Sequence, residues 1–145
     1  THEMAVVKDI CHRVAVMDAG QVVEQGDVYS IFSNPQQPVT RSFIATTSNL
    51  SKVEELIASN DPLVALKPGQ LIVRFNYARQ NVSEATISEI SRRFGVDVSI
   101  IYSNIEILEG APLGGLVAIL SGGQVQDALD YLDKENVRVE VLKRG

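Results

Sequence analysis

The feature that most constrains the fold is an ordered series of strand and helix patterns that fills residues 70–145. Apolar side chains recur with period two in some segments and on one helical face in others, which separates strands from helices. In chain order the patterns predict a strand at 71–77, a helix that ends at Gly95, a strand at 96–109, a strand at 116–120, a helix over 125–132 and a strand at 137–141.

This β-α-β-β-α-β order predicts an α+β domain of the ferredoxin-like type, with a four-stranded antiparallel sheet and two helices on one face. Local signals agree with it. Ser83 is a candidate N-cap for the first helix, and Gly95 is a suitable residue to end it. The segment 112–115 reads as a turn. The nearly continuous apolar run 116–120 predicts a central strand.

The long strand pattern at 96–109 contains one irregularity. Its apolar side chains occupy even positions up to Ile100 and odd positions from Ile105 onward, so the pattern changes phase between Ile101 and Asn104. A bulge of one residue would keep a single face of the strand apolar throughout. We favour the bulge; the alternatives are a strand buried on both faces near its middle or a sheet edge covered by a partner.

The first third of the chain has a different organisation. Two strand patterns, 12–18 and 21–25, flank Ala19-Gly20 and predict a hairpin. Asp27 is a candidate N-cap for a short helix over 28–32.

A connector follows at residues 33–69. It is interrupted by Asn34-Pro35 and Asp61-Pro62 and predicts two short helices, at 40–45 and, capped by Ser51, at 52–59.

The composition excludes several classes of protein. The chain is 45% hydrophobic with a net charge of −5, which indicates a folded domain rather than a general binder of nucleic acid or anionic membrane. Its one cysteine excludes an intrachain disulfide, and we expect no metal site. RNA binding by the sheet is disfavoured because Phe75 and Tyr77 lie on one strand while 116–120 carries no aromatic residue. No apolar run is long enough to span a membrane.

No complete active site is present in the sequence. There is no G-x-x-x-x-G-K-[ST] phosphate loop, and the glycine-rich segment 120–124 lacks the lysine. There is no G-x-S-x-G motif either, and Cys11 beside His12 has no redox or metal spacing.

The N-terminal segment resembles the end of the ATPase domain of ABC transporters. Thr1-His2-Glu3-Met4 resembles the switch loop of that family, residues 12–26 its last hairpin, and residues 27–44 its closing helices. The resemblance implies that His2 contacts the γ-phosphate of ATP, with Mg²⁺, in a complete subunit. Since this chain lacks the phosphate loop, we expect it to be inactive as an ATPase by itself.

The whole chain resembles the C-terminal part of the ATP-binding subunit of methionine ABC importers, which ends in an ACT-like regulatory domain with a ferredoxin fold, the NIL domain. The stretches that carry this resemblance are 91–96, 104–106, 112–115 and 137–142. It implies three segments: an ATPase remnant at 1–45, a linker with a short helix at 46–69, and the regulatory domain at 70–145.

The family resemblance also implies a function. It implies that the regulatory domain binds methionine and inhibits import by feedback. It also implies that two subunits pair and that they attach to a membrane permease on the cytoplasmic face of the membrane. An alternative is a domain that only dimerises the ATPase subunits, without ligand binding.

The candidate ligand residues surround the phase change of the long strand. Methionine requires an apolar slot for its thioether and polar groups for its charged ends. Ile101 would supply the first, and the neighbouring polar side chains the second, unless these only face solvent. The candidate residues are Ser99, Ile101, Tyr102, Ser103 and Asn104.

Overall fold

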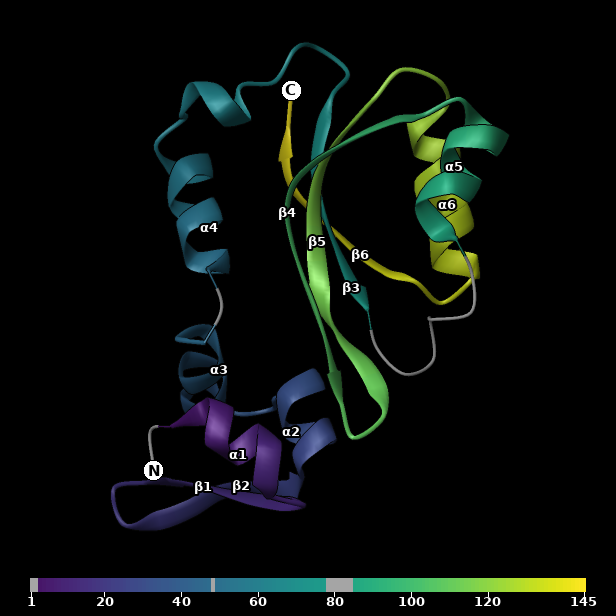
Figure 1. Cartoon of the computed structure of the whole chain (residues 1–145). Coiled ribbons are helices and arrows are strands. Elements are labelled where there is room, and N and C mark those ends of the chain that lie inside the picture. The colour runs from purple at the N-terminus through teal and green to yellow at the C-terminus, as the bar shows by residue number, and fades with distance from the viewer. Residues whose placement is uncertain (1–2, 48, 78–84) are drawn as a thin grey trace.

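The computed structural model describes residues 3–47, 49–77 and 85–145, and these form an N-terminal part of short helices and a two-stranded hairpin, followed by a sheet with two helices (Figure 1). The elements are α1 (Met4–Ile10), β1 (Arg13–Asp18), β2 (Gln21–Asp27), α2 (Val28–Ser33), α3 (Pro38–Ala45), α4 (Leu50–Ala58), the 3₁₀ turn η1 (Pro62–Val64), β3 (Leu71–Tyr77), α5 (Thr86–Phe94), β4 (Asp97–Leu108), β5 (Ala111–Ser121), α6 (Val125–Lys134) and β6 (Arg138–Arg144). We call residues 3–64 the N-terminal region and residues 71–144 the sheet region.

The sheet region has the predicted ferredoxin-like arrangement. Its four antiparallel strands lie in the order β4-β5-β3-β6, so the strand that contains 116–120 is central as expected. Helices α5 and α6 cover one face of this sheet (Figure 1). The predicted fold class is confirmed.

The face under α5 and α6 holds the main hydrophobic core. Phe75, Ile90, Leu120 and Leu132 are fully buried there. Each such side chain stabilises the fold by about 1.5–3 kcal/mol relative to an exposed position. Helix α5 ends, as predicted, at Gly95, whose φ of 65° suits the left-handed conformation of a helix C-terminus.

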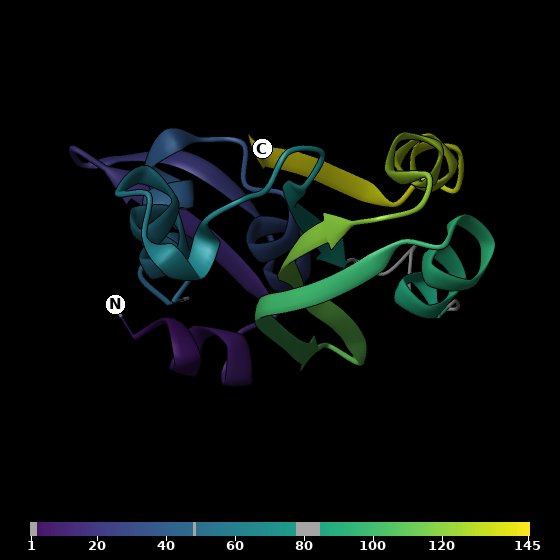
Figure 2. The ribbon, with the colours of Figure 1, turned by 90° about the horizontal axis from the view of Figure 1, so that it is seen from above.

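The opposite face is covered by the N-terminal region, which stands on the far side of the sheet from α5 and α6 (Figures 1 and 2). Two separate clusters attach it. At one end Val53 of α4 and Val64 of η1 pack on Ile72 and Val117. At the other end, side chains of α1 and α2 pack on the tip of the β4–β5 hairpin; the buried members are Val7, Val28, Tyr29, Phe32, Leu108, Ala111 and Leu113.

The predicted bulge in the long strand is present. The register between β4 and β5 shifts between Ile100 and Tyr102, which leaves Ile101 as the extra residue. Residues directly opposite one another in a sheet share a face. The pairing therefore places Ile105 and Ile107 on the same face as Ile100, the face of α5 and α6.

The prediction of a turn at 112–115 is wrong. These residues lie within β5, and the hairpin turns at Glu109-Gly110, where both residues have positive φ, as in a type I′ turn. Pro112 lies beyond the end of β3, and among the described residues β5 pairs with β4 alone there, a one-sided position at which proline is tolerated. Gly114 is required by close strand approach, since a Cβ there would overlap the carbonyl oxygen of Asn104.

Of the two helix N-caps predicted in the first half of the chain, one is confirmed and one is wrong. Asp27 is the N-cap of α2, and its carboxylate accepts a hydrogen bond of 2.9 Å from the backbone N–H of Ser30. Ser51, by contrast, is not a cap. Helix α4 begins at Leu50, two residues before the predicted start at Lys52, and the side chain of Leu50 packs on the Val53 cluster. The expected cap Ser83 lies outside the described residues.

Candidate functional site

An open groove of about 1170 Å³ separates the N-terminal region from the sheet. Its floor is the face of the sheet opposite α5 and α6, and its walls come from α2, α3 and α4. Two of the candidate ligand residues, Tyr102 and Asn104, line it. A concave site of this size can hold a small molecule.

The floor of the groove is built from two rows of residues that cross the four strands. The register places Asn104, Gly115, Asn76 and Arg138 side by side in the first row. Gly115 leaves this row without a side chain at its centre. The row therefore offers two amide groups, each able to donate and accept hydrogen bonds, beside an open stretch of backbone.

The second row crosses the strands two residues further along. It consists of Tyr102, Val117, Arg74 and Glu140. Tyr102 and Val117 form an apolar half, since both belong to the cluster around Ile72. Arg74 and Glu140 form a charged half on neighbouring strands β3 and β6.

The structure separates the five candidate ligand residues. Ser99, Ile101 and Ser103 are not among the side chains that line the groove. Ile101 packs with the Ile72 cluster as the bulged residue. Ser103 lies opposite Leu116, on the face of α5 and α6. His2, the candidate phosphate contact, lies outside the described residues.

Sequence reasoning missed the floor residues on β3 and β6. Arg74 and Asn76 alternate with the buried side chains of Val73 and Phe75. Polar residues at alternate positions of a central strand are a usable signal for a polar site on one face. Glu140 carried no comparable signal, because only the register with β3 places it beside Arg74.

The tip of the β4–β5 hairpin closes one end of the groove against α1 and α2. The Nζ of Lys8 lies 2.6 Å from a carboxylate oxygen of Glu106 and 4.9 Å from the ring centre of Phe32. The hydroxyl of Tyr29 donates a hydrogen bond of 2.7 Å to the carbonyl of Pro112. These contacts join the N-terminal region to the sheet region directly.

A carboxylate from β2 holds another part of the groove wall. Glu24 accepts hydrogen bonds from the backbone N–H groups of Gln36 (2.8 Å) and Gln37 (3.1 Å), at the start of α3. The nearby Thr40 hydroxyl, these two N–H groups and the charge of Arg41 lower the pKa of Glu24 below its usual 4.5. On the sheet side, burial raises the pKa of Tyr77 above its usual 10.0.

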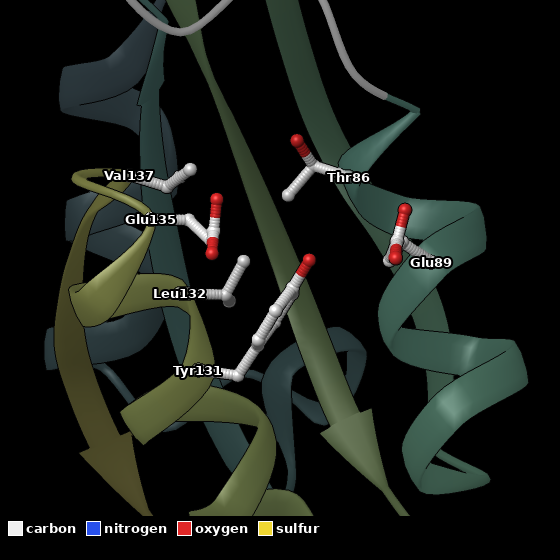
Figure 3. Close-up of a pocket in the computed structure, with 6 residues that line it drawn as sticks. All are labelled: Thr86, Glu89, Tyr131, Leu132, Glu135 and Val137. Atoms are coloured by element: carbon white, nitrogen blue, oxygen red, sulfur yellow. The ribbon is translucent and has the colours of Figure 1, made fainter.

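A second, very small cavity lies between α5 and α6 (Figure 3). Its volume of about 10 Å³ has room for roughly one water molecule. Arg93 joins the two helices next to it, 3.3 Å from Glu89 and 4.4 Å from the ring centre of Tyr131. This cavity is part of the helix packing and is too small for an organic ligand.

Two features are absent from residues 3–47, 49–77 and 85–145. No helix in these ranges has the length and apolar character needed to cross a bilayer. No group of three or more acidic, histidine or cysteine side chains in them is arranged to hold a metal ion.

Comparisons with known proteins place the chain among transporter components. Residues 71–141 match the family model of the NIL domain. The chain is 43% identical over 145 residues to the methionine import ATP-binding protein MetN 1 of Enterococcus faecalis, covering 99% of this chain and 41% of the relative. It is 37% identical to the MetN 2 protein of Oenococcus oeni, with 100% and 42% covered.

A solved structure is also similar. It is the C-terminal domain of an ABC transporter/ATP-binding protein from Enterococcus faecalis, with 29% identity and a TM-score of 0.48, covering 63% of this chain and 97% of that one. Relative to the two MetN proteins, the chain spans about two fifths of their length.

Proposed function

Since residues 71–141 form a NIL domain and the chain is homologous to the C-terminal region of methionine import ATP-binding proteins, we propose that it is part of the ATP-binding subunit of a methionine ABC importer. In the complete subunit, residues 1–45 end the ATPase domain, 46–69 form the linker and 70–145 form the regulatory domain. ATP and Mg²⁺ would bind the complete subunit, as the names of its relatives indicate, and not these 145 residues alone, which contain no phosphate loop.

The proposed role of the sheet region is to bind methionine and so inhibit import by feedback. The observation that carries this proposal is the groove, where Tyr102 and Asn104 of β4 meet the floor of the sheet. Tyr102 offers an apolar ring for the thioether, and Asn104 offers an amide for the charged end. Ser99, Ile101 and Ser103 do not line the groove, and we propose that they act indirectly, by shaping the bulge that presents Tyr102 and Asn104.

The N-terminal region supports the proposed place in an ATPase. Val6, Ile10, Met17 and Val22 are exposed apolar side chains of α1 and of the β1–β2 hairpin. Such a surface fits burial against the body of an ATPase domain. Val16 of β1, by contrast, is buried.

In this proposal His2 contacts the γ-phosphate of ATP in the complete subunit. It precedes α1 by two positions, and α1 is the helix held by the hairpin tip. The subunit works at the cytoplasmic face of the membrane, attached through the permease.

Isothermal titration of the 145-residue chain with L-methionine tests the ligand. We expect saturable heat with a Kd below about 1 mM, and no heat with glycine, which lacks the thioether side chain. Absence of heat with methionine at millimolar concentration would contradict the proposal.

A second copy of the subunit is the other proposed partner, and edge strand β4 favours it. β4 pairs only with β5 within the described sheet, so its outer edge has free backbone groups. Beside that edge, Ile100, Ile105 and Ile107 are 57%, 52% and 71% exposed. A purely structural dimerisation domain would use the same surface.

Sedimentation velocity tests this pairing. We expect the wild-type chain to form dimers and the Ile105→Lys/Ile107→Lys variant to sediment as a monomer. Val22→Lys, an exposed apolar position on β2, serves as the matched control and should remain dimeric. A wild-type chain that stays monomeric up to about 100 µM would exclude the pairing in this chain.

A further inference from the structure

We propose that the floor of the groove binds the zwitterionic head of an α-amino acid, with Arg74 holding the carboxylate and Glu140 the ammonium group. This inference rests on the proposed function and extends the ligand site from β4 to the strands β3 and β6. It assigns roles to residues that the sequence patterns did not single out.

Arg74 is the first observation. It lies on central strand β3, between Val73 and Phe75, and is half-buried at the base of the groove. Within the described part of the chain its guanidinium has no hydrogen bond or ion pair. Arginine is seldom withdrawn from water without a partner, and its planar fork matches a carboxylate in two parallel hydrogen bonds. A bound carboxylate would supply the missing partner.

Glu140 is the second observation. It sits directly opposite Arg74 on β6, where Cβ atoms are roughly 4.5–5.5 Å apart. Yet among the described residues the two side chains form no ion pair. The floor therefore presents a positive and a negative group side by side, each still available. An α-amino acid carries the complementary pair on a single carbon atom.

The neighbouring row completes the complementarity. Asn76 and Asn104 flank Gly115, where the absence of a side chain leaves room above the backbone. Their amides can donate to a carboxylate or accept from an ammonium group. Across the buried Val117, on the side of Arg74 away from Glu140, Tyr102 is half-buried and can receive an apolar side chain.

A ligand on this floor would also face the N-terminal region. Ser51 and Glu54 of α4 line the wall across the groove. The ligand would then bind more tightly when the N-terminal region lies close enough for α4 to contact it. A bound ligand would therefore favour that position of the N-terminal region.

Titration calorimetry of the full chain with L-methionine tests the two charged contacts. Because a hydrogen bond to a charged group is worth about 10- to 100-fold in affinity, Arg74→Met and Glu140→Gln should each weaken binding by that factor. Arg74→Lys, which keeps the charge but loses the fork, should give a smaller loss. Arg92→Met, an exposed arginine on α5 with the same charge change, should bind as the wild type does.

Two methionine analogues identify which group meets which residue. L-Methioninol lacks the carboxylate, so its affinity should be the same for wild type and Arg74→Met. N-Acetyl-L-methionine lacks the ammonium group, so its affinity should be the same for wild type and Glu140→Gln. On the wild-type chain both analogues should bind about 10- to 100-fold more weakly than methionine.

The possible results are distinct. Methionine binding that is equally tight in wild type, Arg74→Met and Glu140→Gln would overturn this inference and leave the proposed function standing. No binding to the wild type would overturn both. If a variant fails to fold by circular dichroism, the analogues on the wild type decide, and analogues that bind as tightly as methionine would overturn the inference.

Discussion

The two faces of the sheet are covered in different ways. Helices α5 and α6 seal one face over a continuous core that includes Phe75, Ile90 and Leu132. Among the described residues, the N-terminal region packs on the other face in two clusters, one at each end, and leaves an open groove between them. One face therefore supplies most of the stability, while the other has a surface that a ligand can reach.

Strand β3 shows how one sequence serves both faces. Val73 and Phe75 point into the sealed core, whereas Arg74 and Asn76 line the groove. Ile72 lies on the groove face too, but at the end where α4 and η1 cover it. The polar residues thus occur only where the cover is missing.

The largest expected effect comes from the sealed face. Phe75→Ala removes a fully buried ring and leaves a cavity, which should lower the free energy of unfolding by about 3–5 kcal/mol. Urea unfolding followed by circular dichroism measures it. Asn76→Ala, the next residue on the groove face, should change stability by less than about 1 kcal/mol. Equal losses in the two variants would contradict the division between the faces.

A smaller effect is expected where the hairpin tip meets α1. The side chains of Lys8 and Glu106 are 15% and 39% exposed, so water screens their ion pair only in part. A double-mutant cycle of Lys8→Met and Glu106→Gln in urea unfolding should give a coupling energy of about 0.5–1 kcal/mol. We expect this coupling to shrink at roughly 1 M salt.

The matched control for this cycle is Arg93→Met with Glu89→Gln. That pair lies four residues apart on α5, in the sealed half of the molecule, and should couple by about 0.3–0.5 kcal/mol. A coupling for Lys8 and Glu106 that is zero in low salt would show that the ion pair does not help to hold the two regions together.

The sequence predicted the sheet region well because its signals are local. Period-two alternation located β3, and the phase change in the long strand indicated the bulge that the register places at Ile101. The segment 112–115 was misread because Pro and Gly mark turns more often than close strand contacts. There the long β4–β5 pairing outweighs the turn propensity of Pro112 and Gly114.

The groove could be predicted only in part. Tyr102 and Asn104 were candidates because they follow the phase change, and they do line the groove. The meeting of Arg74 with Glu140 depends on the register between β3 and β6, which pairs residues about 66 positions apart in the chain and has no local signature. The helical wall depends on how α3 and α4 pack, which periodicity does not determine.

The smallest expected effect is a pH dependence of stability that has opposite signs in the N-terminal region and the sheet region. The folded pKa of Glu24 is lowered, so its carboxylate stabilises the N-terminal region fully above about pH 4.5 and progressively less as the pH falls below that value. The opposite holds for Tyr77 of β3. Its folded pKa is raised, so its contribution is complete below about pH 10 and is lost as the pH rises through the folded value.

Urea unfolding of wild type and Glu24→Gln across this range measures the first effect. We expect the variant to be less stable than the wild type at about pH 7, because the amide binds the N–H groups of Gln36 and Gln37 less strongly than a carboxylate does. The difference should narrow as the pH falls below 4.5 and through the lowered pKa of the wild-type carboxylate. A difference that stays constant from about pH 7 to pH 3 would mean that the charge of Glu24 does not hold α3, and that the groove wall depends on apolar packing alone.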